Sequence, residues 1–239
     1  MTGRVTDLTG TLDLRRRRRR VTLARRIALG VVAVALAVAM YWLVAISDVL
    51  AVRRVVVQGN ALATEDAVVA AAAVPMGLPL VWVDTQAVGA RVAQLPAVAQ
   101  VTVRRDWPNT VTLQVTERSA ALGVPQGSDA FTLVDVDGVA FSTVATLPEG
   151  VVPVTASLQN QRVLRDVATV LSSLPADLRA QVNAVTAPGP DEIVLTLPGV
   201  KVTWGSASDT TVKAQVTKAL LATKATTIDV SSPSHPTTG

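Results

Sequence analysis

The sequence predicts an α+β protein with one N-terminal transmembrane helix, a β-α-α-β-β module and then a mixed β-rich domain with two helices. Three observations favour this fold class. Residues 27–46 are apolar and uncharged, short β-branched runs follow them, and several stretches between these runs carry apolar residues at helical spacing. The 239 residues are enough for a span and one large or two small domains.

The apolar stretch at residues 27–46 has the length of a membrane span. As a helix, its 20 residues would extend about 30 Å, which matches the hydrocarbon core of a bilayer. It is longer than the apolar core of a cleaved signal peptide, so we expect an uncleaved transmembrane helix. Arg25 and Arg26 precede it, and Tyr41 and Trp42 lie near its outer end, where an aromatic belt is expected.

The charge is divided between two parts of the chain. The first 46 residues carry nine arginines against two aspartates, a net charge of +7, and the remainder carries 13 basic against 16 acidic residues, a net charge of −3. Residues 1–26 are therefore expected to form a disordered basic tail that stays in the cytoplasm and contacts anionic lipid. The arginines that would fix this topology are Arg15, Arg16, Arg17, Arg18, Arg19, Arg20, Arg25 and Arg26. A nucleic acid or a cytoplasmic partner is the alternative for the tail, but no nucleic acid is expected on the acidic remainder.

Residue usage argues against an enzyme. The chain has no cysteine and a single histidine, His235, so thiol catalysis, iron–sulfur clusters and cysteine-based zinc sites are excluded. The D-x-D-G sequence at residues 135–138 fails as a calcium loop, because its twelfth position is Thr146 in place of glutamate. We therefore expect no catalytic residues, no metal and no cofactor, and a turn at residues 135–138.

The first module after the span follows the order β-α-α-β-β. Thr64 and Asp84 are predicted N-caps, because each precedes a run of helical character. Asp106 and the three residues after it form a predicted turn. The elements are strands at 52–58, 98–105 and 111–115 and helices at 65–73 and 85–95.

The most specific motifs of the chain lie in this module. They are V-R-R-V-V-V-Q-G-N at 52–60, G-L-P-L-V-W-V-D at 77–84, L-P-A-V-A-Q-V-T-V-R-R-D-W-P-N-T at 95–110 and V-T-L-Q-V-T-E-R at 111–118. Together they resemble the POTRA domain of the bacterial cell-division family FtsQ, which is called DivIB in some lineages. The motif residues are Gly59, Arg105, Trp107, Pro108, Glu117 and Arg118. We interpret them as structural, with Trp107 contributing a buried face, and a partner surface that includes Arg105 or Trp107 is the alternative.

The second half alternates short strands with two helices. Pro153 suggests an edge position for its strand, and Asp209 is a predicted N-cap. In the last helix we expect Val212 to face inward and Lys213 to face outward. The predicted elements are strands at 131–134, 139–141, 151–154, 182–185, 193–197, 200–204 and 226–230 and helices at 162–174 and 210–223.

This half resembles the C-terminal part of the same family. The matching pieces are L-P-G-V-K-V-T-W-G at 197–205, the helix that carries Lys213, and I-D-V-S at 228–231. The expected organisation is a cytoplasmic tail at 1–26, a transmembrane helix at 27–46, a POTRA domain at 52–119, a β domain at 120–232 and a flexible tail at 233–239.

The resemblance implies a non-enzymatic divisome scaffold at the division septum. It would link early and late division proteins, bind bitopic proteins of the FtsB and FtsL type, and through them influence the FtsW–FtsI septal peptidoglycan synthase. The alternatives are a POTRA-bearing translocation or assembly factor and a membrane-tethered extracytoplasmic sensor. The chain shows neither the repeated POTRA domains nor the barrel strands that the former requires.

The last predicted strand is the expected binding edge. Unpaired backbone groups at a sheet edge can accept a partner segment as an added strand, and no charged or bulky residue guards this one. The residues that the resemblance assigns to it are Thr227, Ile228, Asp229, Val230, Ser231 and Ser232. The alternative is an internal strand followed by a disordered tail in which Pro233 and Pro236 limit pairing.

Overall fold

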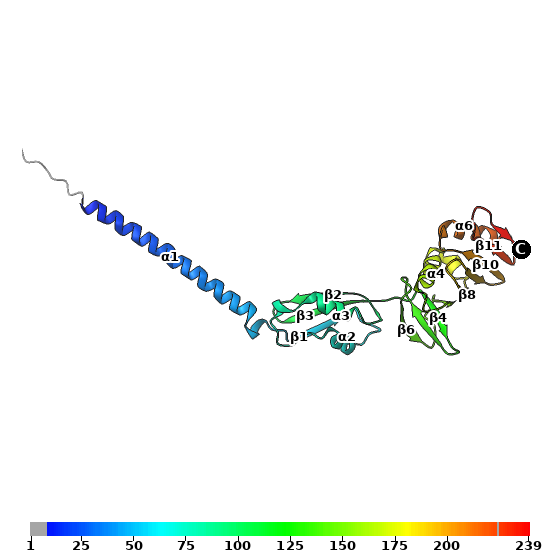
Figure 1. The fold of residues 1–239 in the computed structure, drawn as a ribbon, viewed down its shortest axis with the longest axis horizontal. Coiled ribbons are helices and arrows are strands. Elements are labelled where there is room, and N and C mark those ends of the chain that lie inside the picture. The colour runs from blue at the N-terminus through cyan, green and yellow to red at the C-terminus, as the bar shows by residue number, and fades with distance from the viewer. Residues whose placement is uncertain (1–8, 224) are drawn as a thin grey trace, which may run out of the picture. The chain divides into compact units, whose positions relative to one another are not determined.

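The structure, a computed structural model, describes residues 9–223 and 225–239, and for residues 9–23 it describes the backbone alone. It confirms the predicted α+β class: a long N-terminal helix, a three-stranded sheet with short helices, and a nine-stranded sheet with further helices among the described residues (Figure 1).

Helix α1 (Thr9–Ala45) contains the predicted span. Its segment Ala24–Ala45, with 22 residues and a mean hydropathy of 2.5, is long and apolar enough to cross a membrane. The helix begins well before residue 27, so residues 9–26, expected to be disordered, are helical. Arginine and leucine favour helix, and no proline or glycine interrupts residues 11–26. The side chains of Arg15 to Arg20 lie outside the described part.

The first module has the predicted order, with short 3₁₀ turns added. Its sheet runs β1-β3-β2, and β1 pairs with β3 in parallel from Arg54↔Thr110 to Gln58↔Gln114. Asp84 caps its helix by accepting from the N–H groups of Gln86 and Ala87 at 3.0 Å. The elements are η1 (Asp48–Leu50), β1 (Arg54–Gln58), α2 (Glu65–Ala72), η2 (Leu80–Trp82), α3 (Thr85–Val92), β2 (Val98–Asp106) and β3 (Thr110–Glu117).

The turn between β2 and β3 corrects one expectation. Trp107 is 53% exposed, so it does not contribute the buried face that we expected. The reason is its position in the turn, beyond the last residue of β2, where the sheet offers no apolar layer to cover an indole. The Trp107–Pro108 peptide bond is cis.

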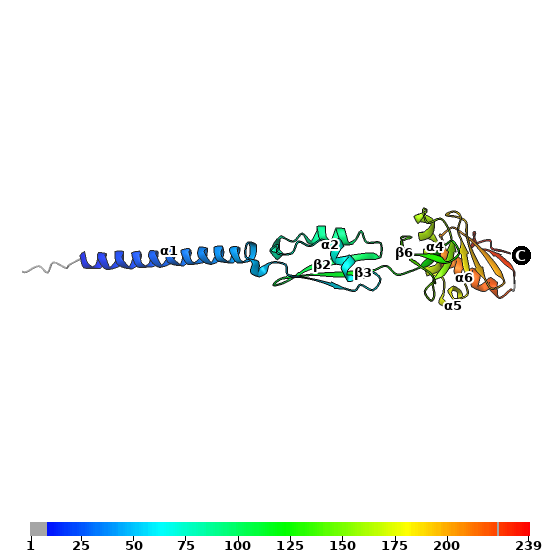
Figure 2. The same ribbon diagram turned by 90° about the horizontal axis from the view of Figure 1, so that it is seen from below.

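The larger sheet has the strand order β12-β11-β10-β9-β8-β7-β4-β5-β6. Helices α4, α5 and α6 accompany it (Figure 2). Its core contains the fully buried Trp204, Leu164, Leu195 and Ile228, and each large apolar side chain contributes about 1.5–3 kcal/mol by leaving water. The elements are β4 (Leu122–Gln126), β5 (Ala130–Val134), β6 (Ala140–Val144), β7 (Val152–Thr155), α4 (Gln161–Ser173), α5 (Ala176–Arg179), β8 (Ala184–Thr186), β9 (Ile193–Leu197), β10 (Val200–Gly205), α6 (Thr210–Leu221), β11 (Thr227–Asp229) and β12 (Thr237–Thr238).

Strand β7 is internal, so the edge position expected from Pro153 is wrong. The strand pairs with β4 through Val152 and Pro153, and with β8 only through Val154 and Thr155. Proline is tolerated because it lies outside the pairing with β8. Strands β4 and β12 and the short helix α5 were not predicted, since each is brief and lacks a clear period.

Helix α6 turns a different face inward from the one predicted. Lys213 is fully buried, whereas Val212 is 49% exposed. The buried positions Lys213, Ala214 and Thr217 share one face at i and i+4 spacing. A hydropathy pattern assigns lysine to the surface, but a lysine can be buried when carbonyl groups receive its ammonium.

Candidate partner-binding edge

The predicted binding strand lies one place inside the end of the large sheet. On its inner side β11 pairs in parallel with β10, from Lys201↔Thr227 to Thr203↔Asp229. On its outer side it pairs with β12, through Ile228↔Thr238 and Asp229↔Thr237. The expectation of an uncovered last strand and a flexible tail at 233–239 is therefore corrected.

The tail reaches this position by reversing direction after β11. The N–H of His235 donates to the carbonyl of Ser232 at 3.0 Å, and Pro233 and Pro236 lie in the reversal. The two prolines thus sit in the loop and not in the paired strands, which is why they do not prevent pairing.

The outward-facing backbone groups of β11 are identifiable from their bonds. The N–H of Thr227 donates to the carbonyl of Gly239, and the N–H of Gly239 donates back to Thr227, both at 3.0 Å. Since groups of successive residues alternate in direction, Thr227 and Asp229 present their backbone to the outer side. Only the short segment at residues 237–239, which is β12 and Gly239, covers them.

The six residues assigned to the edge do not behave alike. Ile228 and Val230 are buried in the core, at 1% and 0% exposure, whereas Thr227, Ser231 and Ser232 are exposed. Asp229 ends the strand, because its carboxylate accepts from the N–H of Ser231 at 2.8 Å. The structure therefore separates the core residues of this set from its exposed residues.

Lys213 supports the neighbouring strand from below the sheet. Its ammonium donates to the carbonyls of Trp204 at 3.0 Å and Ser206 at 2.9 Å, which fixes the end of β10. Desolvation by burial lowers the pKa of Lys213, and Asp209, Asp191 and Asp229 oppose this shift electrostatically. A pattern of hydropathy alone could not have found this contact.

Close packing joins the ends of β10 and β11. Gly205 has a φ of +72°, and a Cβ atom there would lie 2.9 Å from Cβ of Ser231. Any other residue at 205 would therefore strain the backbone and displace the residues that follow β11.

Three of the POTRA-type motif residues, Gly59, Arg105 and Glu117, make close contacts within the module. Gly59 has a φ of +81°, and a Cβ atom there would meet the carbonyl oxygen of Val115 at 2.3 Å. Arg105 donates through its guanidinium to the carbonyl of Val83 at 2.7 and 3.2 Å. The carboxylate of Glu117 accepts from the N–H groups of Leu62 and Ala63.

Glu117 and Arg118 anchor the end of the first module by different means. Burial raises the pKa of Glu117, but the N–H donors of Ala63, Leu62 and Ala61 outweigh burial and hold its pKa below the usual value. Arg118 donates through Nε to the carbonyl of Pro96 at 3.2 Å. Its guanidinium also forms an ion pair with Asp135, in which the two side chains are 19% and 6% exposed.

The D-x-D-G sequence forms a turn, as predicted. Oδ1 of Asp135 accepts from the N–H groups of Asp137 and Val139 at 2.9 and 2.8 Å. With its other oxygen bound to Arg118, this carboxylate is fully used within the protein. No group of three or more His, Asp or Glu side chains that could hold a metal occurs among the described residues.

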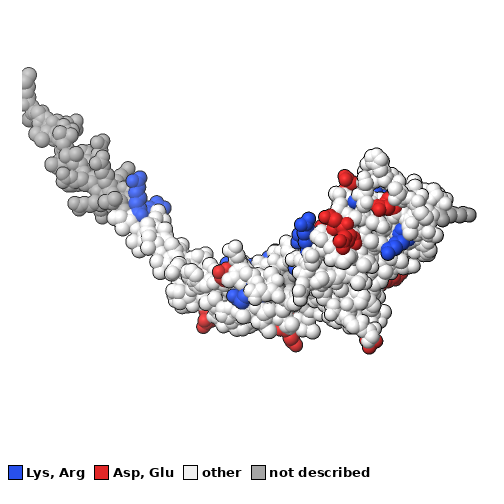
Figure 3. All heavy atoms as spheres, turned by 45° about the vertical axis from the view of Figure 1, so that its right-hand side comes forward, with Lys and Arg blue, Asp and Glu red and all other residues white. Residues whose placement is uncertain are grey.

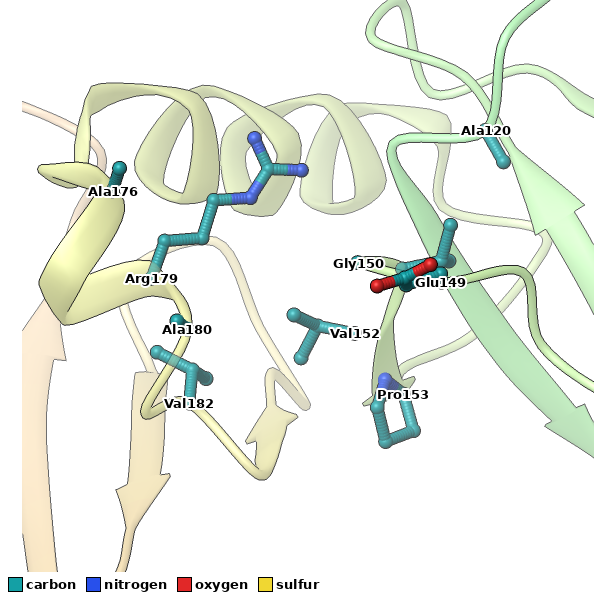
Figure 4. A pocket seen from close by; sticks show the side chains of 10 residues that line it. Ala120, Glu149, Gly150, Val152, Pro153, Ala176, Arg179, Ala180 and Val182 are labelled. Carbon is teal, nitrogen blue, oxygen red and sulfur yellow. The ribbon is translucent and has the colours of Figure 1, made fainter.

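A hollow of about 560 Å³ lies beside the start of β7, and sequence reasoning did not find it. Figure 4 shows Arg179 and Glu149 on opposite sides of an apolar floor that includes Val152 and Val182. It is lined by Ala120, Glu149, Gly150, Val151, Val152, Pro153, Ala176, Arg179, Ala180 and Val182. One acid and one base across an apolar floor give no nucleophile and no acid–base pair at bonding distance, so this hollow supplies no recognisable chemistry.

Charged side chains do not form a broad basic field on the face in view. Figure 3 shows lysine and arginine in small separate groups among larger uncharged areas. This distribution fits the net negative charge after residue 46.

These features define a class of single-pass membrane proteins with one apolar helix, a small three-stranded module and a large mixed sheet. Comparison with known proteins gives the family. The FtsQ-type POTRA domain profile matches residues 50–118, and the profile of the C-terminal part of the cell division protein FtsQ/DivIB matches residues 124–231. The chain belongs to the FtsQ family of cell-division proteins.

Relatives in Streptomyces and Mycolicibacterium support this assignment over most of the chain. The cell division protein FtsQ of Streptomyces griseus is 41% identical over 203 residues, covering 80% of this chain and 97% of that protein. That of Streptomyces collinus is 38% identical over 227 residues, covering 88% and 86%. That of Mycolicibacterium smegmatis is 39% identical over 204 residues, covering 84% and 61%.

Proposed function

We propose that this protein is a non-enzymatic scaffold of the divisome that links early and late division proteins at the septum. Its partners would be bitopic proteins of the FtsB and FtsL type. Through them it would help to control septal peptidoglycan synthesis by the FtsW–FtsI synthase. The observation that carries this proposal is the end of the large sheet, where β11 is covered only by the short segment at residues 237–239.

The proposed topology follows from charge. The arginine-rich segment before Ala24 would remain in the cytoplasm and lie on anionic headgroups, because basic residues are retained on that side. The modules at 52–119 and 120–232 would then lie outside the membrane, where septal synthesis takes place. This arrangement places the proposed edge among the extracytoplasmic parts of other single-span division proteins.

The proposed binding step is replacement of β12 by a partner strand. A backbone hydrogen bond contributes about 1 kcal/mol net, so the pairing of residues 237–239 with β11 is weak beside the five-residue pairing of β4 with β5. A partner segment of four or five residues could engage the outward groups of Thr227 and Asp229 and continue past them. The exposed Ser231 and Ser232 extend the surface available to it.

Depletion of the protein in its own host tests the divisome role. The proposal expects filamentous or branched cells in which chromosomes still segregate, because septation alone would fail. Complementation with the full chain should restore septa, and a fluorescent fusion should collect at division sites. Normal septation after depletion would contradict the proposal.

A photo-crosslinking residue tests the partner surface. Placed at the exposed Thr227 of β11, it should capture a bitopic partner of the FtsB type, and placed at the exposed Val136, which lies in the β5–β6 turn, it should not. Equal capture from both positions would show that the end of the sheet is not the contact.

A further inference from the structure

The tryptophans of this chain are distributed unusually. Of its four tryptophans, Trp204 is fully buried, whereas Trp42, Trp82 and Trp107 are 57%, 57% and 53% exposed. Tryptophan is highly buried on average in water-soluble domains, and it is enriched where a membrane meets water. Trp42 belongs to the span itself, whereas Trp82 and Trp107 lie in the module that follows it.

Trp82 is tied directly to the end of the span. Its indole Nε1 donates to the carbonyl of Ala45 at 3.0 Å, and Ala45 is the last residue of the apolar helix. The segment around Trp82 also runs beside the chain that leaves the helix. Ala51 forms a bridge with Pro79, and the N–H of Val52 donates to the carbonyl of Leu78 at 2.9 Å.

Trp107 is tied to the same stretch of chain. The carbonyl of Asn109, two residues after it, accepts from the N–H groups of Arg53 and Arg54 at 2.9 and 3.3 Å. Arg105, two residues before it, binds the carbonyl of Val83 next to Trp82. Both tryptophan-bearing turns therefore lie against residues that follow the span within ten positions.

Exposed apolar side chains continue around these turns. We call this set the juxtamembrane face: Ile46, Val49, Val81, Trp82 and Trp107, which are 56%, 57%, 36%, 57% and 53% exposed. Single exposed apolar residues are ordinary on protein surfaces, but five of them on segments that hydrogen bonds hold together at the end of a membrane span call for an occupant. The charged residues of the same segments are Arg53, Arg54, Arg104 and Arg105 against Asp48, Asp84 and Asp106.

We propose that the juxtamembrane face docks on the bilayer surface and inserts the indoles of Trp82 and Trp107 among the lipid headgroups. A bilayer around Ala24–Ala45 places the carbonyl of Ala45 at its boundary, and Trp82 with it. An indole suits this depth, because its apolar ring meets the acyl chains while its N–H finds a polar acceptor. The basic and acidic residues of these segments nearly cancel, so apolar insertion is the driving force and docking should occur on zwitterionic as well as anionic lipid.

The absence of cysteine allows a direct test with single labels. The full-length chain is reconstituted into vesicles of phosphatidylcholine, with and without an equal part of phosphatidylglycerol. Single variants Val81→Cys and Val49→Cys carry an environment-sensitive fluorophore, and Val136→Cys and Val212→Cys are matched controls that are 56% and 49% exposed in the native protein. Quenching is measured with aqueous iodide and with lipid that carries a nitroxide near the headgroup.

The expected result is several-fold stronger lipid quenching and weaker iodide quenching at Val81 and Val49 than at the two controls, in both lipid mixtures. Val81 is the decisive position, because it lies far from the span in sequence. A Val81 label that responds like the controls would overturn the proposal. The Trp82→Ala, Trp107→Ala double variant should return the Val81 label toward control values. An unchanged lipid contact in that variant would overturn the role of the indoles.

Discussion

Thr227 and Gly239 exchange two backbone hydrogen bonds, N–H to carbonyl in each direction, both at 3.0 Å. The pair closes the outer side of β11 with the chain's own terminal segment. Neither group of Thr227 bonds to β10. The neighbouring bonds between the two strands are donated by the N–H of Lys201 to the carbonyl of Thr226 and by the N–H of Val230 to the carbonyl of Thr203. The outer face of β11 can therefore be altered without loosening the sheet beneath it.

Weakening β12 should strengthen partner binding. Thr237 lies opposite Asp229, and Thr237→Pro removes a donor from this pair while leaving β11 intact. If the partner replaces β12, we expect several-fold tighter binding of a bitopic partner of the FtsB type, measured by titration with the full chain in detergent. Thr237→Val keeps the backbone donor and is the control. Weaker binding by Thr237→Pro would instead show that the partner adds outside β12.

Glu117 should stabilise the first module through its charge. Glu117→Gln weakens the hydrogen bonds to Leu62 and Ala63, and we expect a loss of about 1–2 kcal/mol in the free energy of unfolding. Because the pKa of Glu117 is lowered on folding, its contribution is present above about pH 4.3 and is lost as the pH falls through the lowered pKa. Urea unfolding at several pH values measures this, and the exposed Glu149→Gln is the control. This assignment would be contradicted if the difference in the free energy of unfolding between Glu117→Gln and the native chain grew toward acid pH.

The Arg118–Asp135 ion pair should be costly to break from one side. Asp135→Asn leaves a largely buried guanidinium without its counter-charge, for which we expect about 3 kcal/mol of destabilisation. Asp137→Asn alters an exposed carboxylate in the same turn and should change stability by less than about 0.5 kcal/mol. Thermal or chemical unfolding compares the two variants. Similar effects of both would show that the pair is unimportant.

The lowered pKa of Lys213 predicts that the free energy of unfolding changes at alkaline pH. Desolvation lowers its pKa, so between that value and the ordinary value of about 10.4 the unfolded chain binds more protons than the folded one. The free energy of unfolding of the native protein should therefore rise with pH in this range, relative to Lys213→Met, in which nothing titrates at this position. Chemical unfolding near neutral pH and near pH 10 measures the difference. A difference that falls with pH would contradict the assigned pKa direction.

Sequence reasoning succeeded where periodicity and turn chemistry are strong. The span, the caps at Thr64 and Asp84, and the hairpin around Gly199 follow from local patterns, and the structure contains all of them. The fold class and the family also followed from the motifs.

The misses share a physical cause, which is dependence on distant contacts. Lys213 is buried because carbonyls of the β10 end receive its ammonium, and no local pattern reveals those acceptors. Pro153 is tolerated in the internal strand β7, because the pairing of β7 with β8 begins at the next residue, Val154. The two-residue β12 exists only through its pairing with β11, so neither its length nor its composition could predict it.

The Thr227→Pro variant tests the central claim most directly. It removes the outward N–H of Thr227, whereas Thr227→Val keeps that donor and changes only the side chain. Because Thr227→Pro would also weaken the pairing of β12, both variants are made in the full-length Thr237→Pro chain, in which β12 is already released, and circular dichroism and thermal unfolding check that each is folded. In titrations with a bitopic partner of the FtsB type, we expect Thr227→Pro to lose at least about tenfold in affinity relative to that chain, which corresponds to about 1.4 kcal/mol, and Thr227→Val to bind like it. Unchanged affinity in a folded Thr227→Pro variant would contradict strand addition at β11.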